Sequence, residues 1–204
     1  MDTIIYIIIG LNVIISYYAW KNPNIFRRYC LNPYNLIRNK QYDRIITHAF
    51  LHGSWTHLII NMLVLWSFSL ALLQYINHFF NVSEVLIFLI LYFGAIIASS
   101  IYSIMKNKDN INYNAVGASG ATSAVVFACI FFNPWHKLYF FGVLPIPGII
   151  FGVIYLIYSY RMAKKSSDNI GHDAHFWGAV FGLFFFIIIK PGLLNFFLNQ
   201  LTNF

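Results

Sequence analysis

Six long apolar stretches divide this chain of 204 residues, and they constrain its fold more than any other feature. A run of about 18 apolar residues is long enough to cross the hydrocarbon core of a bilayer as a helix. The fifth and sixth stretches are shorter, and neighbouring helices or a locally thinner bilayer can accommodate them. We therefore predict an all-α membrane protein in which residues 1–204 form one domain of six transmembrane helices. The predicted helices cover approximately residues 3–20, 57–78, 84–104, 115–132, 146–161 and 174–190.

Charged side chains are too scarce for a protein that folds in water. They make up 9% of the chain, whereas hydrophobic residues make up 59%; soluble domains have about 25% charged residues. The net charge of +7 is therefore interpreted as a signal of membrane topology. We expect membrane lipids, and no nucleic acid, among the partners.

The first apolar stretch lacks the flanking features of a cleaved signal peptide. No basic segment precedes it and no small-residue cleavage site follows Trp20, so we expect it to be retained. The two cysteines, Cys30 and Cys129, fall in the first connection and in the middle of a predicted helix. This spacing predicts neither a disulfide nor a metal site.

Basic residues are concentrated in three of the connections between predicted helices. The first, third and fifth connections hold six, two and three of the 13 Lys and Arg residues. By the positive-inside rule, these connections lie in the cytoplasm and the N-terminus lies outside. The residues are Lys21, Arg27, Arg28, Arg38, Lys40 and Arg44, then Lys106 and Lys108, then Arg161, Lys164 and Lys165; the other two are Lys137 and Lys190.

Several polar residues lie around the start of the second predicted helix, where burial in hydrocarbon is costly and indicates a functional site. His57 and Asn61 are four residues apart, so they project from one helix face. Both side chains can donate hydrogen bonds, and two such donors beside a nucleophile can form an oxyanion hole. His48 and His52 are also four apart, but Gly53 separates them from this register. We expect these two histidines to shape the junction between loop and helix.

Metal binding is the main rival interpretation of the histidines, because His172 and His175 add two further imidazoles. The chain has no His-Glu-x-x-His motif, and the one acidic residue close to the later pair is Asp173. We therefore predict no metal and no cofactor. For His48, His52 and His172 we expect hydrogen bonds to backbone groups at helix ends.

Ser119 stands between the polar segment 110–114 and the apolar run that starts at Ala121, in the first turn of an apolar helix. Unpaired N–H groups and the positive end of the helix dipole stabilise an alkoxide or oxyanion at such a position. Gly117 and Gly120 allow another backbone to approach closely. This motif alone is weak, because small residues are common wherever membrane helices cross.

The sixth predicted helix carries a histidine above a stripe of small residues. His175, Gly178 and Gly182 share one helix face. On the fourth predicted helix a matching stripe begins beside Ser119. Two such stripes let helices pack backbone to backbone, which would bring the imidazole within reach of the serine hydroxyl, as a general base requires. The stripe on the fourth helix consists of Gly120, Ala124 and Ala128.

Taken together, these motifs resemble the rhomboid family of intramembrane serine proteases. They occur in the family's order and on its helices two, four and six. They cover about residues 40–185. The matching residues are Arg44; His48, His52, His57 and Asn61; Gly117, Ser119 and Gly120; and Ala174, His175, Gly178 and Gly182.

The resemblance implies a catalytic dyad and an oxyanion hole. Ser119 is implied as the nucleophile, and His175 as its general base and later general acid, without a carboxylate partner. The implied oxyanion donors are His57, Asn61 and the backbone N–H groups of Ser119 and Ala118.

The resemblance also implies a six-transmembrane-helix rhomboid-like bundle with a partly membrane-embedded first loop around Arg44. In such a bundle Gly178 and Gly182 bring the sixth helix against the fourth. The fifth helix and the loop 164–171 are expected to gate the lateral entry of substrate.

Two positions depart from the family pattern. Asp43 stands where the family has the Trp of a Trp-Arg pair, so we expect the first loop to be anchored differently. Ser123 stands where some members have a Tyr that stacks on the catalytic histidine. Phe176, Phe127 or a hydrogen bond from Ser123 could orient His175 instead, and the sequence does not choose among them.

We therefore predict an intramembrane serine endopeptidase that cleaves single-pass transmembrane proteins near the membrane surface and acts as a monomer. The alternative is a catalytically inactive rhomboid-like protein that binds membrane clients. The resemblance implies a multi-pass protein of the bacterial inner membrane with its N-terminus in the cytoplasm and its active site open to the outside. The charge pattern predicts the reverse orientation, and both alternatives stay open at this point.

Overall fold

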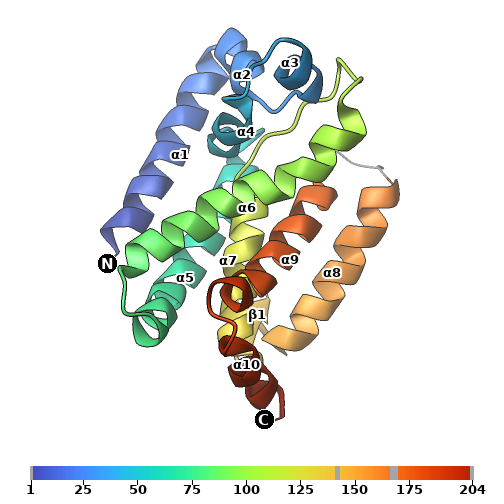
Figure 1. The fold of residues 1–204 in the computed structure, drawn as a ribbon. Helices are drawn as coiled ribbons and strands as arrows, with labels where there is room; N and C mark the ends of the chain where they lie inside the picture. Colours follow the sequence, from blue (N-terminus) through green and yellow to red (C-terminus); the bar gives the residue numbers. More distant parts are fainter. Residues whose placement is uncertain (1, 141–142, 166–169, 203–204) are drawn as a thin grey trace.

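The computed structural model describes residues 2–140, 143–165 and 170–202, and most of them are helical (Figure 1). Short helices of the first loop cover one end of a bundle of longer ones. In chain order the elements are α1 (Thr3–Lys21), α2 (Pro23–Tyr29), α3 (Pro33–Arg38), α4 (Arg44–Thr47), the 3-10 helix η1 (His48–Phe50), α5 (Trp55–Phe79), α6 (Glu84–Asn107), α7 (Ser119–Phe132), β1 (Lys137–Phe140), β2 (Leu144–Pro147), α8 (Gly148–Lys165), α9 (His172–Ile189) and α10 (Leu193–Thr202).

Four helices in the described part of the chain are long and apolar enough to cross a membrane: α1, α5, α6 and α9. The predicted all-α membrane class agrees with this finding. The helix α7 is also apolar but has 14 residues. The helix α8 has 18 residues, with Lys164 and Lys165 in its last turn. A count of six membrane spans therefore remains a prediction.

Two predicted helix starts were wrong because strand-like pairing, long-range in one case and a local hairpin in the other, competes with helix formation. The predicted helix 115–132 begins only at Ser119, since Ala115 exchanges two backbone hydrogen bonds with Leu31, at 2.9 and 3.0 Å. The predicted helix 146–161 begins at Gly148, since the two residues before it pair with β1 in an antiparallel hairpin. The hairpin and α10 were not predicted.

The helix α7 lies at the centre of the bundle. Every residue from Gly120 to Phe132 is buried. The helices α5, α6 and α9 pack around α7, α1 lies outside α5, and α8 lies against α7 and α9 at the opposite edge (Figure 1). Because α7 is enclosed by protein, its length is not constrained by the need to match a bilayer.

The closest helix contact joins α7 to α9 through small residues. A Cβ atom added to Gly178 would lie 2.8 Å from the carbonyl carbon and 2.9 Å from the Cα of Gly120. A Cβ atom added to Gly182 would lie 2.5 Å from the Cα of Ala124. The two backbones therefore touch where the sequence predicted matching stripes of small residues, and the predicted packing role of Gly178 and Gly182 agrees with this geometry.

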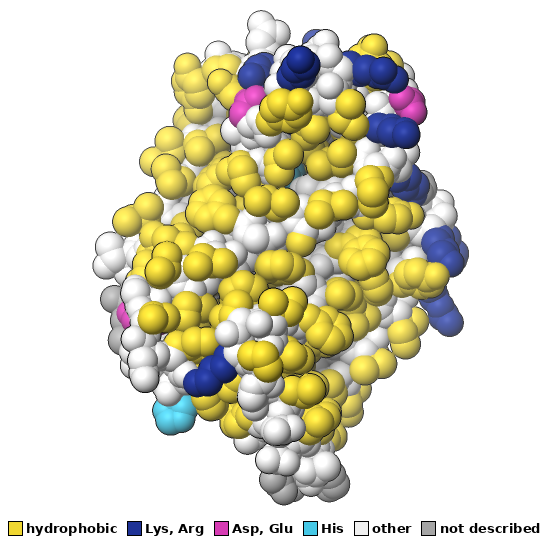
Figure 2. All heavy atoms as spheres, viewed as in Figure 1, with side chains coloured by type: hydrophobic (Ala, Val, Ile, Leu, Met, Phe, Trp, Pro, Cys, Tyr) yellow, Lys and Arg dark blue, Asp and Glu magenta, His cyan; other side chains and the backbone are white. Residues whose placement is uncertain are grey.

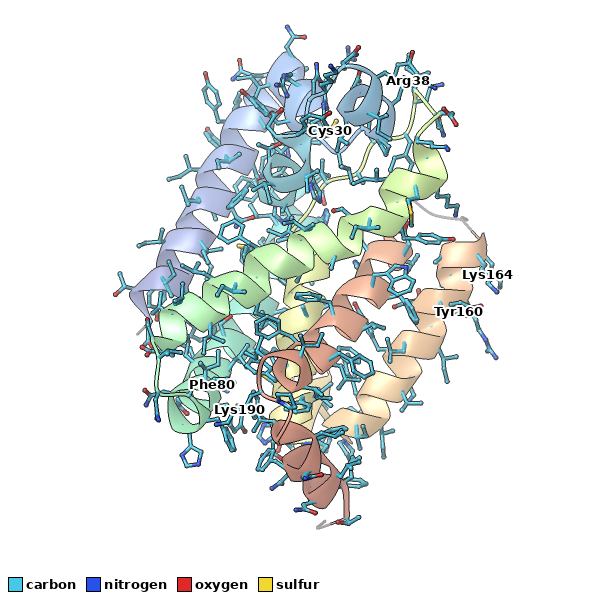
Figure 3. All side chains as sticks on the ribbon, viewed as in Figure 1. Cys30, Arg38, Phe80, Tyr160, Lys164 and Lys190 are labelled. Carbon is cyan, nitrogen blue, oxygen red and sulfur yellow. The ribbon has the colours of Figure 1, made fainter. Side chains whose placement is uncertain are left out.

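The two ends of the molecule differ in charge. Figure 2 shows hydrophobic side chains over the middle of the visible face, and Lys and Arg side chains mainly at the end formed by α2, α3 and the C-terminal part of α8. At that end, Lys164 Nζ lies 4.3 Å from the ring centre of Tyr160 (Figure 3). At the opposite end, Lys190 donates to the carbonyl oxygen of Phe79 at 2.6 Å and lies 5.3 Å from the ring centre of Phe80. This hydrogen bond ties the end of α9 to the end of α5.

The contact between α7 and α9 predicts a strong position dependence of glycine substitutions. We expect Gly178→Ala to lower the free energy of unfolding by at least about 2 kcal/mol, because the added methyl group meets backbone atoms of α7 that cannot rotate away. The measurement is the thermal midpoint of the protein in detergent. Gly10→Ala, in the middle of α1 with no atom within 4 Å of the added carbon, is the matched control and should not be destabilised. Equal midpoints for the two variants would contradict the packing argument.

Candidate active site

The predicted nucleophile, Ser119, is the first residue of α7. The N-cap residue, Ala118, provides no side-chain cap for the free N–H groups of this helix. The preceding Gly117 has a φ of +119°, a conformation that L side chains rarely adopt, and its N–H donates to the carbonyl oxygen of His48 at 3.0 Å. The start of α7 is thus held by a glycine turn, and its N-cap residue, Ala118, gives the first N–H groups no side-chain cap.

The side chains of His57 and Asn61, both on α5, lie beside this turn. A Cβ atom added to Gly117 would lie 2.7 Å from His57 Nε2 and 3.7 Å from Asn61 Nδ2. The predicted donors are therefore adjacent to the backbone two residues before Ser119. A residue larger than glycine would displace the imidazole.

The amide of Asn61 is buried and only half satisfied. Thr122 Oγ1 donates to Asn61 Oδ1 at 3.4 Å and to the carbonyl oxygen of Ser119 at 3.1 Å. Within the described residues, Asn61 Nδ2 has no hydrogen-bond partner. Buried donors are almost always paired, so an orphan of this kind needs an explanation. A developing negative charge on a bound carbonyl oxygen would supply the missing acceptor.

The predicted base, His175, lies in the first turn of α9, which places it at the same end of the bundle as Ser119. A Cβ atom added to Gly120, the residue after Ser119, would lie 3.4 Å from the carbonyl oxygen of Ala174, the residue before His175. The start of α9 is fixed by Asp173, which accepts a hydrogen bond from the backbone N–H of Ala174 at 2.9 Å. The close approach of the two backbones therefore brings the neighbours of the predicted dyad together.

Tyr155, on α8, is the site residue that the sequence analysis missed. Its hydroxyl lies 2.7 Å from Ser123 Oγ, and its ring is stacked on the imidazole of His175, with centroids 6.3 Å apart and planes at 26°. Ser123 is one helical turn after Ser119 on α7, so these contacts also place His175 on the Ser119 side of that helix. Nothing in the local sequence around Tyr155 indicates the contact, because it joins three separate helices.

The other two candidates for orienting His175 have different neighbours. The ring of Phe176 packs against Tyr160 at 5.8 Å and Trp177 at 5.3 Å. The ring of Phe127 packs against Tyr155 at 5.6 Å. Of the three predicted options, Ser123 and Phe127 therefore both contact Tyr155, whose ring is stacked on His175.

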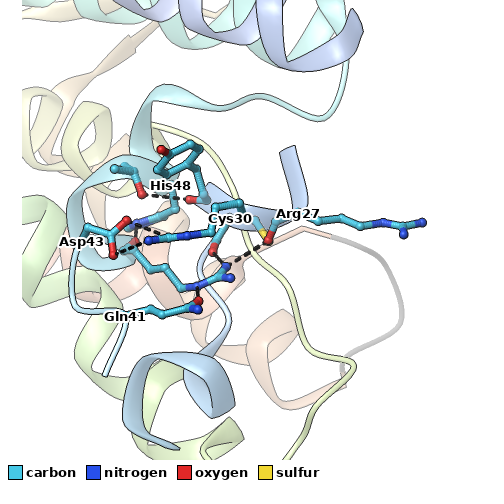
Figure 4. Close-up of polar contacts among 9 residues, drawn as sticks. Arg27, Cys30, Gln41, Asp43 and His48 are labelled. Carbon is cyan, nitrogen blue, oxygen red and sulfur yellow. Dashed lines mark hydrogen bonds and ion pairs between the residues drawn. The ribbon is translucent and has the colours of Figure 1, made fainter. Parts of the chain in front are cut away.

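Arg44 holds the first loop together from within. Its guanidinium is buried and donates to Gln41 Oε1 at 2.7 Å and to the carbonyl oxygens of Arg27 and Cys30 at 3.0 and 2.6 Å (Figure 4). Its own carbonyl oxygen lies 2.9 Å from His48 Nδ1. The expectation that His48 binds a backbone group is confirmed. Arg44 and His48 thereby link the loop to the glycine turn before α7.

Asp43, which replaces the expected tryptophan, makes a salt bridge within the loop. Its two carboxylate oxygens accept from Arg28 at 2.8 and 3.2 Å (Figure 4). The hydrogen bond from Arg28 lowers the pKa of Asp43 below its usual value. Both side chains are exposed, so this bridge orders the loop surface and adds little stability.

Two further histidines pack beside the predicted functional ones. The ring of His52 contacts His57 edge-on at 5.0 Å, and its Nδ1 lies 3.0 Å from Ser16 Oγ. The ring of His172 contacts His175 edge-on at 5.8 Å. In residues 2–140, 143–165 and 170–202, no three His, Cys, Asp or Glu side chains form a group that could hold a metal ion. Part of the predicted gating loop 164–171, residues 166–169, lies outside the described residues.

This arrangement defines a helical membrane protein whose polar groups converge at the starts of α5, α7 and α9. Residues 39–192 match the family model described as the rhomboid domain. The chain therefore belongs to the rhomboid family, as its motifs predicted.

Three relatives extend the comparison. The chain is 33% identical over 153 residues to Rhomboid protein 1, mitochondrial, of Saccharomyces cerevisiae, covering 71% of this chain and 40% of that protein. It is 23% identical over 167 residues to RHOMBOID-like protein 12, mitochondrial, of Arabidopsis thaliana, covering 74% and 48%. It is 27% identical over 147 residues to Presenilin-associated rhomboid-like protein A, mitochondrial, of Danio rerio, covering 69% and 36%. The chain thus spans less than half of the length of each relative. The names of all three relatives include the word mitochondrial, so the predicted location in a bacterial inner membrane remains unconfirmed.

The burial of His48 predicts an acid-sensitive fold. Burial lowers the pKa of His48 from 6.5 to about 4, so the unfolded chain takes up a proton first as the pH falls below 6.5. Each pKa unit corresponds to about 1.4 kcal/mol, and the free energy of unfolding should fall by up to about 3 kcal/mol between pH 7 and pH 4. Thermal unfolding in detergent across this range measures the effect. His48→Gln, which keeps a donor and an acceptor but cannot titrate, should show a smaller loss; parallel curves would contradict the assignment.

Proposed function

We propose that this protein is an intramembrane serine endopeptidase in which Ser119 and His175 form a catalytic dyad. The main observation behind the proposal is the backbone contact between α7 and α9 at Gly120 and Gly178. Gly120 directly follows Ser119, and Gly178 lies one helical turn after His175. Asn61 Nδ2, which lies beside the same turn and has no hydrogen-bond partner in the described part of the chain, supports it. Family membership supports the reaction class.

The dyad performs proton transfer and nucleophilic attack in turn. His175 accepts the proton of the Ser119 hydroxyl as the serine oxygen attacks the substrate carbonyl carbon. The negative charge that develops on the carbonyl oxygen is stabilised by Asn61, His57 and the uncapped N–H groups at the start of α7. His175 then protonates the leaving amine, and a water molecule, deprotonated by the same imidazole, hydrolyses the acyl-enzyme.

The depth of the site follows from the length of α7. Fourteen residues form a helix about 21 Å long, whereas the hydrocarbon core of a bilayer is about 30 Å thick. We place the C-terminal end of α7 at the opposite membrane surface, so Ser119 lies below the surface at the end of the bundle that carries the polar first loop. Water reaches the serine from that end, while the rest of α7 stays enclosed by protein.

The substrates we propose are single-pass transmembrane proteins. A spanning helix has no free carbonyl to attack, so a substrate must contain a locally weak helix, rich in Gly, Ala or Pro, near the membrane face. We propose cleavage after a small residue. Entry is lateral, past α8, and one copy of the chain is sufficient for activity in the presence of membrane lipids.

Substitution of the dyad provides the direct test. We expect Ser119→Ala and His175→Ala to abolish cleavage of a transmembrane model substrate in liposomes, because each removes a group that takes part in bond making. Asn61→Ala should retain turnover that is slower by roughly a hundredfold, since one oxyanion donor contributes about 3 kcal/mol. Labelling by a serine-reactive fluorophosphonate is the second readout. A wild-type protein that neither labels nor cleaves would instead support an inactive protein that binds membrane clients.

Cysteine labelling tests the orientation in the membrane. The charge pattern places the basic end in the cytoplasm, whereas the family orientation, which we propose, places that end outside. Lys165 is the last residue of α8, and Lys137 is the first residue of the hairpin that precedes α8, so the two positions mark opposite ends of this unit. Both native cysteines are buried, so they should react little. We expect an impermeant maleimide added to intact cells to label Lys165→Cys and spare Lys137→Cys; the reverse pattern would establish the orientation that the charges predict.

A further inference from the structure

A chain of contacts runs from α7 through α8 to the imidazole of the proposed dyad. Ser123 Oγ lies 2.7 Å from the hydroxyl of Tyr155, and the Tyr155 ring is stacked on the His175 ring at 6.3 Å and 26°. Near-parallel rings within about 7 Å interact favourably beyond their burial of area. The imidazole therefore has an aromatic surface that restricts its rotation about the side-chain torsions.

The Tyr155 ring is itself held on several sides. It packs against Phe127 at 5.6 Å and against Phe151 at 5.7 Å. Gly152 lies one turn before Tyr155 on α8, and a Cβ atom added there would meet Phe127 Cε1 at 3.4 Å, an ordinary van der Waals contact. The hydroxyl contact with Ser123 fixes the far end of the ring. With three neighbouring rings and its hydroxyl in contact, Tyr155 has little freedom while α8 stays seated against α7.

The helix α8 contacts the start of α9 at a second aromatic pair. The ring of Tyr158 meets that of His172 edge-on at 5.5 Å, and His172 in turn meets His175 edge-on at 5.8 Å. Tyr155 thus contacts His175 directly, whereas Tyr158 reaches it through His172. A lateral displacement of α8 would remove both contacts at once.

We propose that Tyr155 is a positioning residue for the general base, and that it makes catalysis depend on the seating of α8. Its ring holds the His175 imidazole in the orientation that accepts the Ser119 proton, and Ser123 holds the ring. The inference rests on the proposed function, because it concerns the base of that reaction. It assigns to α8 a role beyond the passage of substrate: when α8 moves away, the base loses its support.

The first test separates positioning from packing by comparing kcat with KM. We expect Tyr155→Leu to lower kcat by at least about tenfold, a fraction of what general-base catalysis contributes, with KM within about twofold of wild type. Tyr155→Phe keeps the ring and should retain most of the kcat. Tyr160→Leu, an exposed tyrosine on the same helix whose ring contacts Phe176, is the matched control and should match wild type.

Thermal midpoints and fluorophosphonate labelling rates accompany the kinetics. A slower labelling rate for Tyr155→Leu at an unchanged midpoint supports positioning. A kcat equal to that of Tyr160→Leu overturns the proposal. A fall in kcat that follows a fall in midpoint, and that Tyr155→Phe does not rescue, also overturns it, because a packing defect then accounts for the loss.

A swap of the two hydrogen-bonded residues provides the second test. In a Tyr155→Ser background, Ser123→Tyr returns an aromatic ring to the same space from α7, with the total side-chain volume kept. We expect the double variant to recover at least part of the kcat that Tyr155→Ser loses. A folded double variant with no recovery counts against the role of the ring.

The controls keep this inference distinct from the proposed function. Wild-type protein that cleaves, together with an inactive Ser119→Ala variant, establishes the protease. If Tyr155→Leu is then as active as wild type, the positioning role alone is refuted. If wild type neither cleaves nor labels, both proposals are refuted.

Discussion

The backbone contact between α7 and α9 is the interaction on which the site depends. Small residues at Gly120, Gly178 and Gly182 bring the two helices closer than any side chain would allow. Between membrane helices the hydrophobic effect offers no net attraction, so close van der Waals packing must supply the stability. The same closeness brings Gly120 and Ala174, the chain neighbours of Ser119 and His175, together at the helix starts. The same small residues therefore stabilise the fold and bring the elements of the proposed site together.

The first loop supports the site from outside the bundle. The buried Arg44 donates hydrogen bonds to two carbonyl oxygens of the loop, and the carbonyl oxygen of His48 accepts one from the N–H of Gly117. The glycine, with its positive φ, then leaves room for His57. A hydrogen-bond path thus connects a polar surface loop to the start of α7. This path explains why so many polar residues are placed at one end of an otherwise apolar protein.

The contact between Tyr155 and His175 places an aromatic ring against the imidazole even though Ser123 stands on α7. Where some family members have a Tyr on the same helix as the nucleophile, this chain has Ser123. The aromatic ring comes instead from α8, and the serine binds its hydroxyl. This ring is carried by the helix at the edge of the bundle, and we propose that the support of the base is therefore sensitive to that helix.

The sequence by itself determined the apolar helices, the small-residue stripes and the polar residues at the starts of α5, α7 and α9, because these features depend on local spacing along a helix. It did not determine where α7 begins, since that depends on the pairing of Ala115 with Leu31, which lies far away in the chain. The start of α8 likewise depends on the hairpin with β1. Tyr155 could not be found from the sequence, because only the packing of three helices brings its ring to His175.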